Sequence, residues 1–148
     1  MTVSQLNYRE RIIYIYVKEI EGGIVSGMFY HYRLKYPIVF SCLADLVLKA
    51  DILFDKVCKQ NELETISGEI NPVLDEYHEI SLGWKPLYVF ALNVYYRQNN
   101  SWQGTINYAR NKDILYFKSV LDLMKQLTNI MGISQNDSYI EKSMIINE

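Results

Sequence analysis

Residues 24–54, IVSGMFYHYRLKYPIVFSCLADLVLKADILF, match residues 101–131, SWQGTINYARNKDILYFKSVLDLMKQLTNIM, when the chain is shifted along itself by 77 positions (24 to 101). Without a gap, the shift aligns the following identical residues: Gly27 with Gly104, Arg33 with Arg110, Lys35 with Lys112, Phe40 with Phe117, Asp45 with Asp122 and Leu46 with Leu123. The hydrophobic pattern follows the same shift. The match predicts an internal repeat, which has to be sought first because a missed repeat leads to a wrong fold.

Each copy begins with strand patterns and ends with a helix pattern. In the first copy, apolar residues alternate over 11–20 and 24–33, as half-buried strands require, and a short strand follows at 38–40. A helix to about residue 59 carries an apolar stripe spaced by three and four residues. The second copy repeats this order from about 86 to 132. A glycine within the second strand of each copy indicates a bulge or a close backbone approach.

The repeat predicts an α+β fold in which two strand-strand-strand-helix units form one antiparallel sheet with the helices packed on one face. We expect a single domain over residues 1–148, with repeat one at about 11–59, a connector at 60–85, repeat two at about 86–132 and a tail at 133–148. In the connector, Asn71 and Pro72 are typical of a helix start, and a short helix is expected through about Glu79.

Composition limits the classes of function. The chain has 15 basic and 17 acidic residues, a net charge of -2, so no overall attraction to nucleic acid or to an anionic membrane is expected. The first residues do not form a secretory signal, and no apolar run is long enough to span a bilayer. Cys42 and Cys58 are separated by about 24 Å if both lie on one helix, too far for a disulfide, which favours free thiols and a cytoplasmic location.

The most specific local motif is Trp102, Gln103 and Gly104 in a strand, followed by a helix that opens with Phe117, Ser119 and the run Leu-Asp-Leu at 121–123. In this motif the chain resembles a group of small uncharacterised bacterial proteins with a Trp-Gln-Gly strand before a Phe-x-Ser-x-Leu-acid-Leu helix. The resemblance covers roughly the last third of the chain. It implies a bacterial origin and no particular activity. From its strand position, Trp102 is expected in the core, with a ligand platform as the alternative.

Asp45 and Asp122 occupy equivalent places in the two copies. One interpretation is a pair of carboxylates that shares a proton. The favoured interpretation is helix capping, because Ser119 and Asp122 form an S-x-x-D pattern at a helix start. The enzyme alternative would place an acid/base site between the halves, built from Asp45, Asp122 or His31.

Two equivalent basic pairs, Arg33 with Lys35 and Arg110 with Lys112, lie in predicted turns and could hold an anion. Solvated turn residues are the simpler interpretation. His31 and His78 are the only histidines and lack any metal-binding spacing, so no metal site is predicted. No nucleotide-binding or hydrolase motif occurs either, and no cofactor is expected.

Tyrosine is unusually frequent, with 13 residues. Several fall on the strand positions opposite the predicted core: Tyr14, Tyr16, Tyr30, Tyr32 and Tyr95. Tyrosine is enriched in interfaces, so this face could contact another subunit, and internal packing explains it equally well. Together with Arg33, Trp102 and Arg110, four of these tyrosines form the candidate binding set: Tyr14, Tyr16, Tyr30 and Tyr32. The preferred function is a non-enzymatic binding or regulatory protein that acts through protein contact, such as a homodimer, with an enzyme or an anion-binding module as alternatives.

Overall fold

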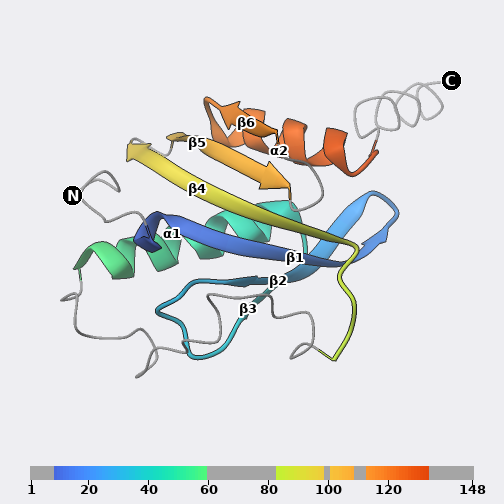
Figure 1. Cartoon of the computed structure of the whole chain (residues 1–148), viewed down its shortest axis with the longest axis horizontal. Coiled ribbons are helices and arrows are strands. Elements are labelled where there is room, and N and C mark those ends of the chain that lie inside the picture. Colours follow the sequence, from blue (N-terminus) through green and yellow to red (C-terminus); the bar gives the residue numbers. More distant parts are fainter. Residues whose placement is uncertain (1–8, 60–82, 99–100, 109–112, 134–148) are drawn as a thin grey trace, which may run out of the picture.

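The computed structural model describes residues 9–59, 83–98, 101–108 and 113–133. They form a six-stranded antiparallel sheet in the order β3-β2-β1-β4-β5-β6 with two helices, which confirms the predicted α+β class and the antiparallel sheet (Figure 1). The strands are β1 (Ile12–Glu21), β2 (Ile24–Tyr30), β3 (Ile38–Phe40), β4 (Tyr88–Gln98), β5 (Ser101–Tyr108) and β6 (Ile114–Phe117). The helices are α1 (Leu43–Lys59) and α2 (Val120–Ile130), and a single 3-10 turn, η2 (Arg9–Arg11), precedes β1.

The sheet is joined at its centre by β1 and β4, the first strand of each predicted copy. In this ladder Tyr14 lies opposite Ala91, the residue 77 positions further along the chain. On either side the pairs continue in register, with Ile15 opposite Phe90 and Ile13 opposite Leu92. The order of strands therefore runs outward from the β1–β4 pair in the same sequence on both sides, ending at the edge strands β3 and β6.

Gly27 and Gly104 occupy equivalent positions in the β1–β2 and β4–β5 hairpins. Both face a β-bulge on the neighbouring strand, at Val17 to Glu19 in β1 and at Val94 to Tyr96 in β4. A Cβ on Gly27 would lie 2.0 Å from the Tyr16 carbonyl oxygen, and one on Gly104 would lie 1.9 Å from that of Asn93. The close backbone approach expected from the sequence is confirmed, because no other residue fits at such distances.

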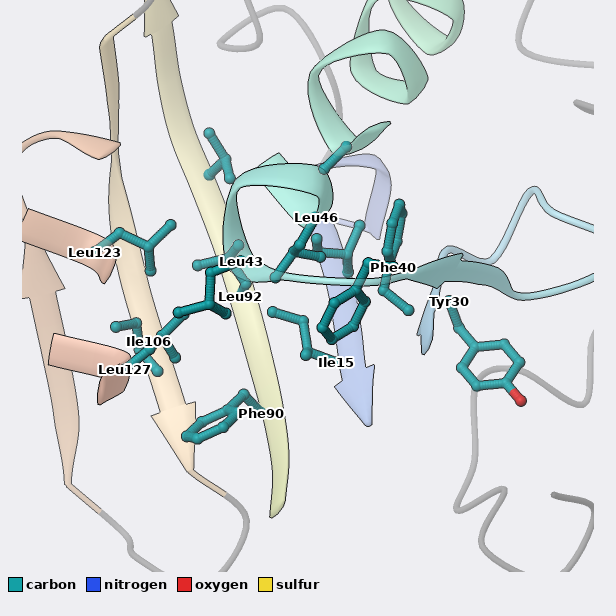
Figure 2. Close-up of a cluster of buried hydrophobic side chains, with 14 of the residues drawn as sticks. Ile15, Tyr30, Phe40, Leu43, Leu46, Phe90, Leu92, Ile106, Leu123 and Leu127 are labelled. Atoms are coloured by element: carbon teal, nitrogen blue, oxygen red, sulfur yellow. The ribbon is translucent and has the colours of Figure 1, made fainter. Parts of the chain in front are cut away.

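The core lies between the sheet and the two helices, which cover the same face (Figure 1). Figure 2 shows Leu43 and Leu46 of α1 and Leu123 and Leu127 of α2 gathered over Leu92 and Ile106 of the central strands. Phe40 and Phe117 are both buried, and each lies opposite one of the two strand glycines. At Gly104 the Phe117 ring approaches to 3.0 Å from the place that a Cβ would take.

A glycine with a left-handed backbone conformation ends α2. Gly132 has φ +72°, and the Gly132 and Ile133 N–H groups donate to the carbonyls of Asn129 and Thr128. This is the Schellman arrangement that closes a helix with a left-handed glycine. In the ranges that the structure describes, neither helix combines the length and the apolar character needed to cross a membrane.

Most predicted bounds agree with the structure to within two residues, and the main difference is at β2. We expected this strand to continue to Arg33, but it ends at Tyr30, and the Leu34 N–H closes a turn on the His31 carbonyl (2.9 Å). Residues 31–34 form this turn instead of continuing the ladder, and the Arg33 N–H donates to the His31 side chain (Nδ1, 3.2 Å). The predicted connector helix at 71–79 and most of the tail, 134–148, lie outside the described residues, as do Arg110, Lys112 and His78.

Candidate functional site

A buried polar cluster closes the end of β2. It contains Glu10, His31 and Arg33, none of which is more than 5% exposed. Arg33 forms an ion pair with the Glu10 carboxylate (Nη1···Oε2 3.1 Å). The Arg33 backbone N–H donates to His31 Nδ1 (3.2 Å), so the proton of the neutral imidazole is on Nε2, which donates to the Glu10 carbonyl (2.9 Å). The three residues thus bind one another in the protein interior, although the Nε of Arg33 has no hydrogen-bond partner among the described residues.

The electrostatics of this cluster keep His31 neutral. The pKa of His31 is lowered from 6.5 to about 4, and burial is the largest cause; the hydrogen bond to Glu10 raises the pKa, and the positive charges of Arg33 and Arg9 lower it. At neutral pH the imidazole is fully enclosed and uncharged. Neither His31 as an acid or base nor Arg33 as an anion ligand is accessible to a molecule in solution, although the sequence placed both among the candidates.

A second polar cluster joins the β4–β5 hairpin to α1. The Arg97 guanidinium donates to Asp51 (Nη1···Oδ1 2.6 Å) and to Asp55 (Nη2···Oδ1 2.6 Å). The indole N–H of Trp102 donates to the same oxygen of Asp51 (3.3 Å). Burial acts against the charge of Arg97, but the two carboxylates outweigh it and raise the pKa of Arg97 above its usual value. Trp102 is a buried core residue with a satisfied indole, as the favoured interpretation expected.

One aromatic ring connects the two polar clusters. The Phe54 ring lies edge-on to Trp102 (centroids 5.8 Å apart) and to His31 (6.4 Å). The Arg97 guanidinium carbon is 5.9 Å from the same ring centroid. The arrangement is a continuous assembly of charges and rings in which His31, Phe54 and Trp102 are buried and the two aspartates reach solvent, and its chemistry is that of a structural brace rather than of an open site.

Asp45 and Asp122 each cap a helix. The Asp45 carboxylate accepts the Ser41 N–H (2.9 Å), and that of Asp122 accepts the Lys118 N–H (2.9 Å). These backbone bonds are the largest cause of the lowered pKa of both carboxyls. The capping interpretation is confirmed, and both groups are ionised and engaged at neutral pH.

The tyrosines of the candidate binding set differ widely in exposure. Tyr16 and Tyr30 are buried and meet edge to face, with centroids 5.1 Å apart. Burial raises the pKa of Tyr30. Tyr14 is half-buried, and Tyr32 is half-buried beneath the Arg9 guanidinium, 4.5 Å from the ring centroid. A partner that approaches this face would therefore reach Tyr14 and Tyr32 and not the other two.

Cys42 and Cys58 are free thiols, as expected. Cys42 precedes α1, where its sulfur accepts the Asp45 N–H (3.4 Å), and Cys58 lies near the end of the helix. Burial raises the pKa of the Cys58 thiol, which keeps it protonated and unreactive. Across the described ranges, no group of three or more His, Cys, Asp or Glu side chains could hold a metal ion.

The accessible surfaces of interest lie at the two edges of the sheet. At the β6 edge, four large apolar side chains are exposed within eight residues: Ile114, Leu115, Tyr116 and Leu121. We call them the β6 patch. At the other edge, a groove of about 360 Å³ lies between α1 and the segment that leads into β3. Its apolar lining includes Leu34, Ile38, Ile52 and Leu53, with Tyr36, Lys49 and Lys56 at its sides. We call it the α1–β3 groove.

Sequence reasoning missed Arg97, its two aspartates, Glu10 and both edge surfaces. Arg97 gave no signal in the sequence, because alternation from Phe90, Leu92 and Val94 places it on the opposite face, and the β-bulge between Val94 and Tyr96 turns it toward α1. Asp51 and Asp55 lie one helical turn apart on α1, which is the spacing of a two-carboxylate clamp. Glu10 precedes all the predicted elements and carried no signal at all.

Comparison of the chain with models of known protein families, with curated protein sequences and with solved structures found no match.

Proposed function

We propose that the chain is a non-enzymatic binding protein, built from two copies of a strand-strand-strand-helix unit, that self-associates through the β6 patch. The observation that carries the proposal is the exposure of four large apolar side chains on one edge strand and the helix turn that follows it. Both free cysteines fit a cytoplasmic setting, which we include in the proposal.

Side-chain contacts that recur at the 77-residue interval support the duplication. Lys49 donates to the Val39 carbonyl (2.7 Å), and Gln126 donates to the Tyr116 carbonyl (2.6 Å). The caps of Asp45 and Asp122 recur at the same interval. A duplicated unit whose first strands pair with each other has a pseudo-twofold axis, and this axis passes between Tyr14 and Ala91.

The two edges differ in protection. Edge strands are usually guarded by proline or lysine, because unpaired backbone groups invite association. Pro37 leads into β3, and Lys49 covers its outer carbonyl. At β6 the side chain in the place of Lys49 is the neutral Gln126, and Ile114 takes the place of Pro37. At this less guarded edge Tyr116 is 70% exposed and Leu121 62%, so both are available to a partner.

The β6 strand favours a second copy of this chain as the binding partner of the β6 patch. A twofold axis makes two β6 strands antiparallel, so each presents outward backbone groups to the other. The strand begins after Asp113 and ends before Lys118, and antiparallel pairing brings the acidic end of one strand toward the basic end of the other. When the two β6 strands pair, a backbone N–H of the second copy replaces the Gln126 amide as the hydrogen-bond donor to the Tyr116 carbonyl.

We assign no reaction to the chain. The enzyme alternative requires a free acid or base at Asp45, Asp122 or His31, and all three are engaged in local hydrogen bonds. The anion-binding alternative used Arg33 and Arg110. Arg33 is fully buried against Glu10, and Arg110 lies outside the described residues.

Sedimentation and light scattering test the self-association. We expect a dimer at about 100 µM protein, and we expect Tyr116→Lys to shift the chain to monomer because it places a charge in the patch. The matched control is Val39→Lys, at the equivalent position on the β3 edge, which should leave the dimer intact. Circular dichroism of each variant checks its fold. A monomeric wild type, or a folded Tyr116→Lys variant that still dimerises, would overturn the proposal.

A further inference from the structure

We infer that the α1–β3 groove binds a partner protein through a short segment in which apolar side chains alternate with acidic ones. This surface is at the opposite edge of the sheet from the β6 patch. The inference therefore goes beyond self-association and does not depend on it.

The groove is built by one stripe of α1 and the chain before β3. Lys49, Ile52 and Lys56 follow one another at intervals of three and four residues, so they lie along one face of the helix. Ile52 is 55% exposed and Tyr36 is 66% exposed, although both line a concave surface whose floor is apolar. The volume of about 360 Å³ is at the small end of the range for ligand sites, roughly 300–1,000 Å³. Such a space suits a few side chains of a peptide better than a large cofactor.

The charge around the groove selects an anionic partner. Two lysines, Lys49 and Lys56, line it, and the Lys35 ammonium lies 5.4 Å from the centroid of the Tyr36 ring at its side. Lys49 is balanced by Asp45 (3.0 Å), whereas Lys56 has no ion pair within the described residues. Lys56 therefore contributes a positive charge that no described carboxylate balances, in a chain whose net charge is -2. The apolar floor of the groove and the lysines at its rim are complementary to a segment that carries both leucine-like and carboxylate side chains.

The β3 edge fixes how such a segment is held. Lys49 occupies the outward carbonyl of Val39, and Pro37 lacks an N–H, so a peptide cannot extend the sheet there as an added strand without displacing Lys49. The partner is therefore held by side-chain contacts in the groove, with its acidic groups near Lys56. Affinity should then depend on salt, as expected for exposed charges.

The test uses two fluorescent peptides with the full chain: Glu-Leu-Glu-Leu-Glu and its counterpart Lys-Leu-Lys-Leu-Lys. We expect the acidic peptide to bind with Kd below about 1 mM by fluorescence anisotropy, and the basic peptide to bind at least about tenfold more weakly, a difference of about 1.4 kcal/mol. NMR shifts on titration should concentrate at Ile52, Leu53 and Lys56. Raising the salt from about 50 to 300 mM should weaken the acidic complex.

Matched variants separate the groove from other surfaces. Lys56→Glu and Ile52→Ser should each weaken binding at least about fivefold, as expected for central interface residues. Lys125→Glu and Leu48→Ser change exposed residues of the same types outside the groove and should leave Kd unchanged. Lys56→Glu should leave the oligomeric state unchanged, and Tyr116→Lys should still bind the acidic peptide, so failure of one proposal is distinguishable from failure of the other.

Three results would overturn the inference. The first is no saturable binding of the acidic peptide at about 5 mM, well above the affinity expected for a specific contact. The second is equal affinity for both peptides, or a Kd that folded Lys56→Glu leaves unchanged. The third is Lys56-dependent binding to phosphatidylserine vesicles without peptide binding, which would assign the groove to a membrane surface.

Discussion

The tips of the two central hairpins occupy matching places in the sheet but have opposite chemistry. At the β4–β5 tip, Arg97 lies opposite Trp102 and is held by Asp51 and Asp55 of α1. At the β1–β2 tip, the corresponding cross-strand pair is Ile20 and Val25, both apolar. The positions that correspond to the two aspartates are Thr128 on α2 and Gly132 just beyond its end, neither of which carries a charge.

This difference shows which features the backbone path of a hairpin requires and which side-chain contacts can differ between the two hairpins. Both hairpins keep the glycine, the bulge and the phenylalanine opposite, because these fix the path of the chain. The charged brace occurs at one tip only, so the fold can close a hairpin against a helix with or without it. Losses should therefore be severe and equal at the glycines and moderate and unequal at the tips.

The largest effect is expected at the two glycines. Gly27→Ala and Gly104→Ala each place a methyl group within 2.0 Å of a backbone oxygen of the adjacent strand. Each should cost more than about 4 kcal/mol, because backbone cannot move aside as a side chain can. Urea denaturation gives the free energy of unfolding, with Ser26→Ala as the control in the same strand. If one glycine tolerates alanine with little loss, the two hairpins are not equivalent.

The next effect is a pH dependence confined to the first half. His31 has Tyr108 as its counterpart, and Tyr108 packs against Phe90 (5.3 Å) without a buried imidazole. Above pH 6.5, His31 is neutral in the folded and the unfolded chain, so it adds no pH dependence. Between pH 6.5 and about 4 the unfolded chain binds a proton that the folded chain does not, so stability falls as the pH falls. At about 1.4 kcal/mol per pKa unit, the loss reaches about 3 kcal/mol near pH 4.

Urea unfolding across this pH range measures that slope. His31→Gln should be less stable at neutral pH and should have a much flatter dependence between pH 6.5 and about 4, because no buried imidazole then gains a proton on unfolding. Tyr108→Phe is the matched control and should keep the slope of the wild type. Parallel slopes for wild type and His31→Gln would mean that the buried cluster opens before His31 titrates.

The smallest effect is expected at the tips themselves. Arg97→Met removes the brace but retains most of the apolar stem, and Asp51 and Asp55 are 37% and 51% exposed, so water can solvate them afterwards. We expect a loss of about 2 kcal/mol, below the value for a fully buried pair. Ile20→Met in the other hairpin conserves volume and should cost less than about 1 kcal/mol. Equal losses at both tips would show that the charges contribute nothing beyond packing.

Much of the fold was predictable because its signals are local. The strand Ile38–Phe40 and the helix end at Lys59 agree with the expected bounds, and Asp45 and Asp122 cap helices as their positions indicated. Alternation and three-to-four spacing reflect which face of an element is buried, and that can be read within a dozen residues.

The polar clusters were not predictable in this way. Arg33 looked like a solvated turn residue, yet it is buried because Glu10, 23 residues earlier, supplies its counter-charge. Arg97 and Asp51 are 46 residues apart in the chain. Nothing in either local pattern specifies the other, because an ion pair depends on where two elements meet and not on the sequence around each partner.

The amino-acid sequence alone therefore determined the kind and order of the elements and the places where only glycine fits, since each depends on near neighbours along the chain. The tertiary structure decided that β1 and β4 meet at the centre, that one hairpin tip is charged and the other apolar, and that the exposed surfaces lie at opposite edges. These features arise from contacts between distant segments, whose partners are chosen by packing and by the cost of burying an unpaired charge.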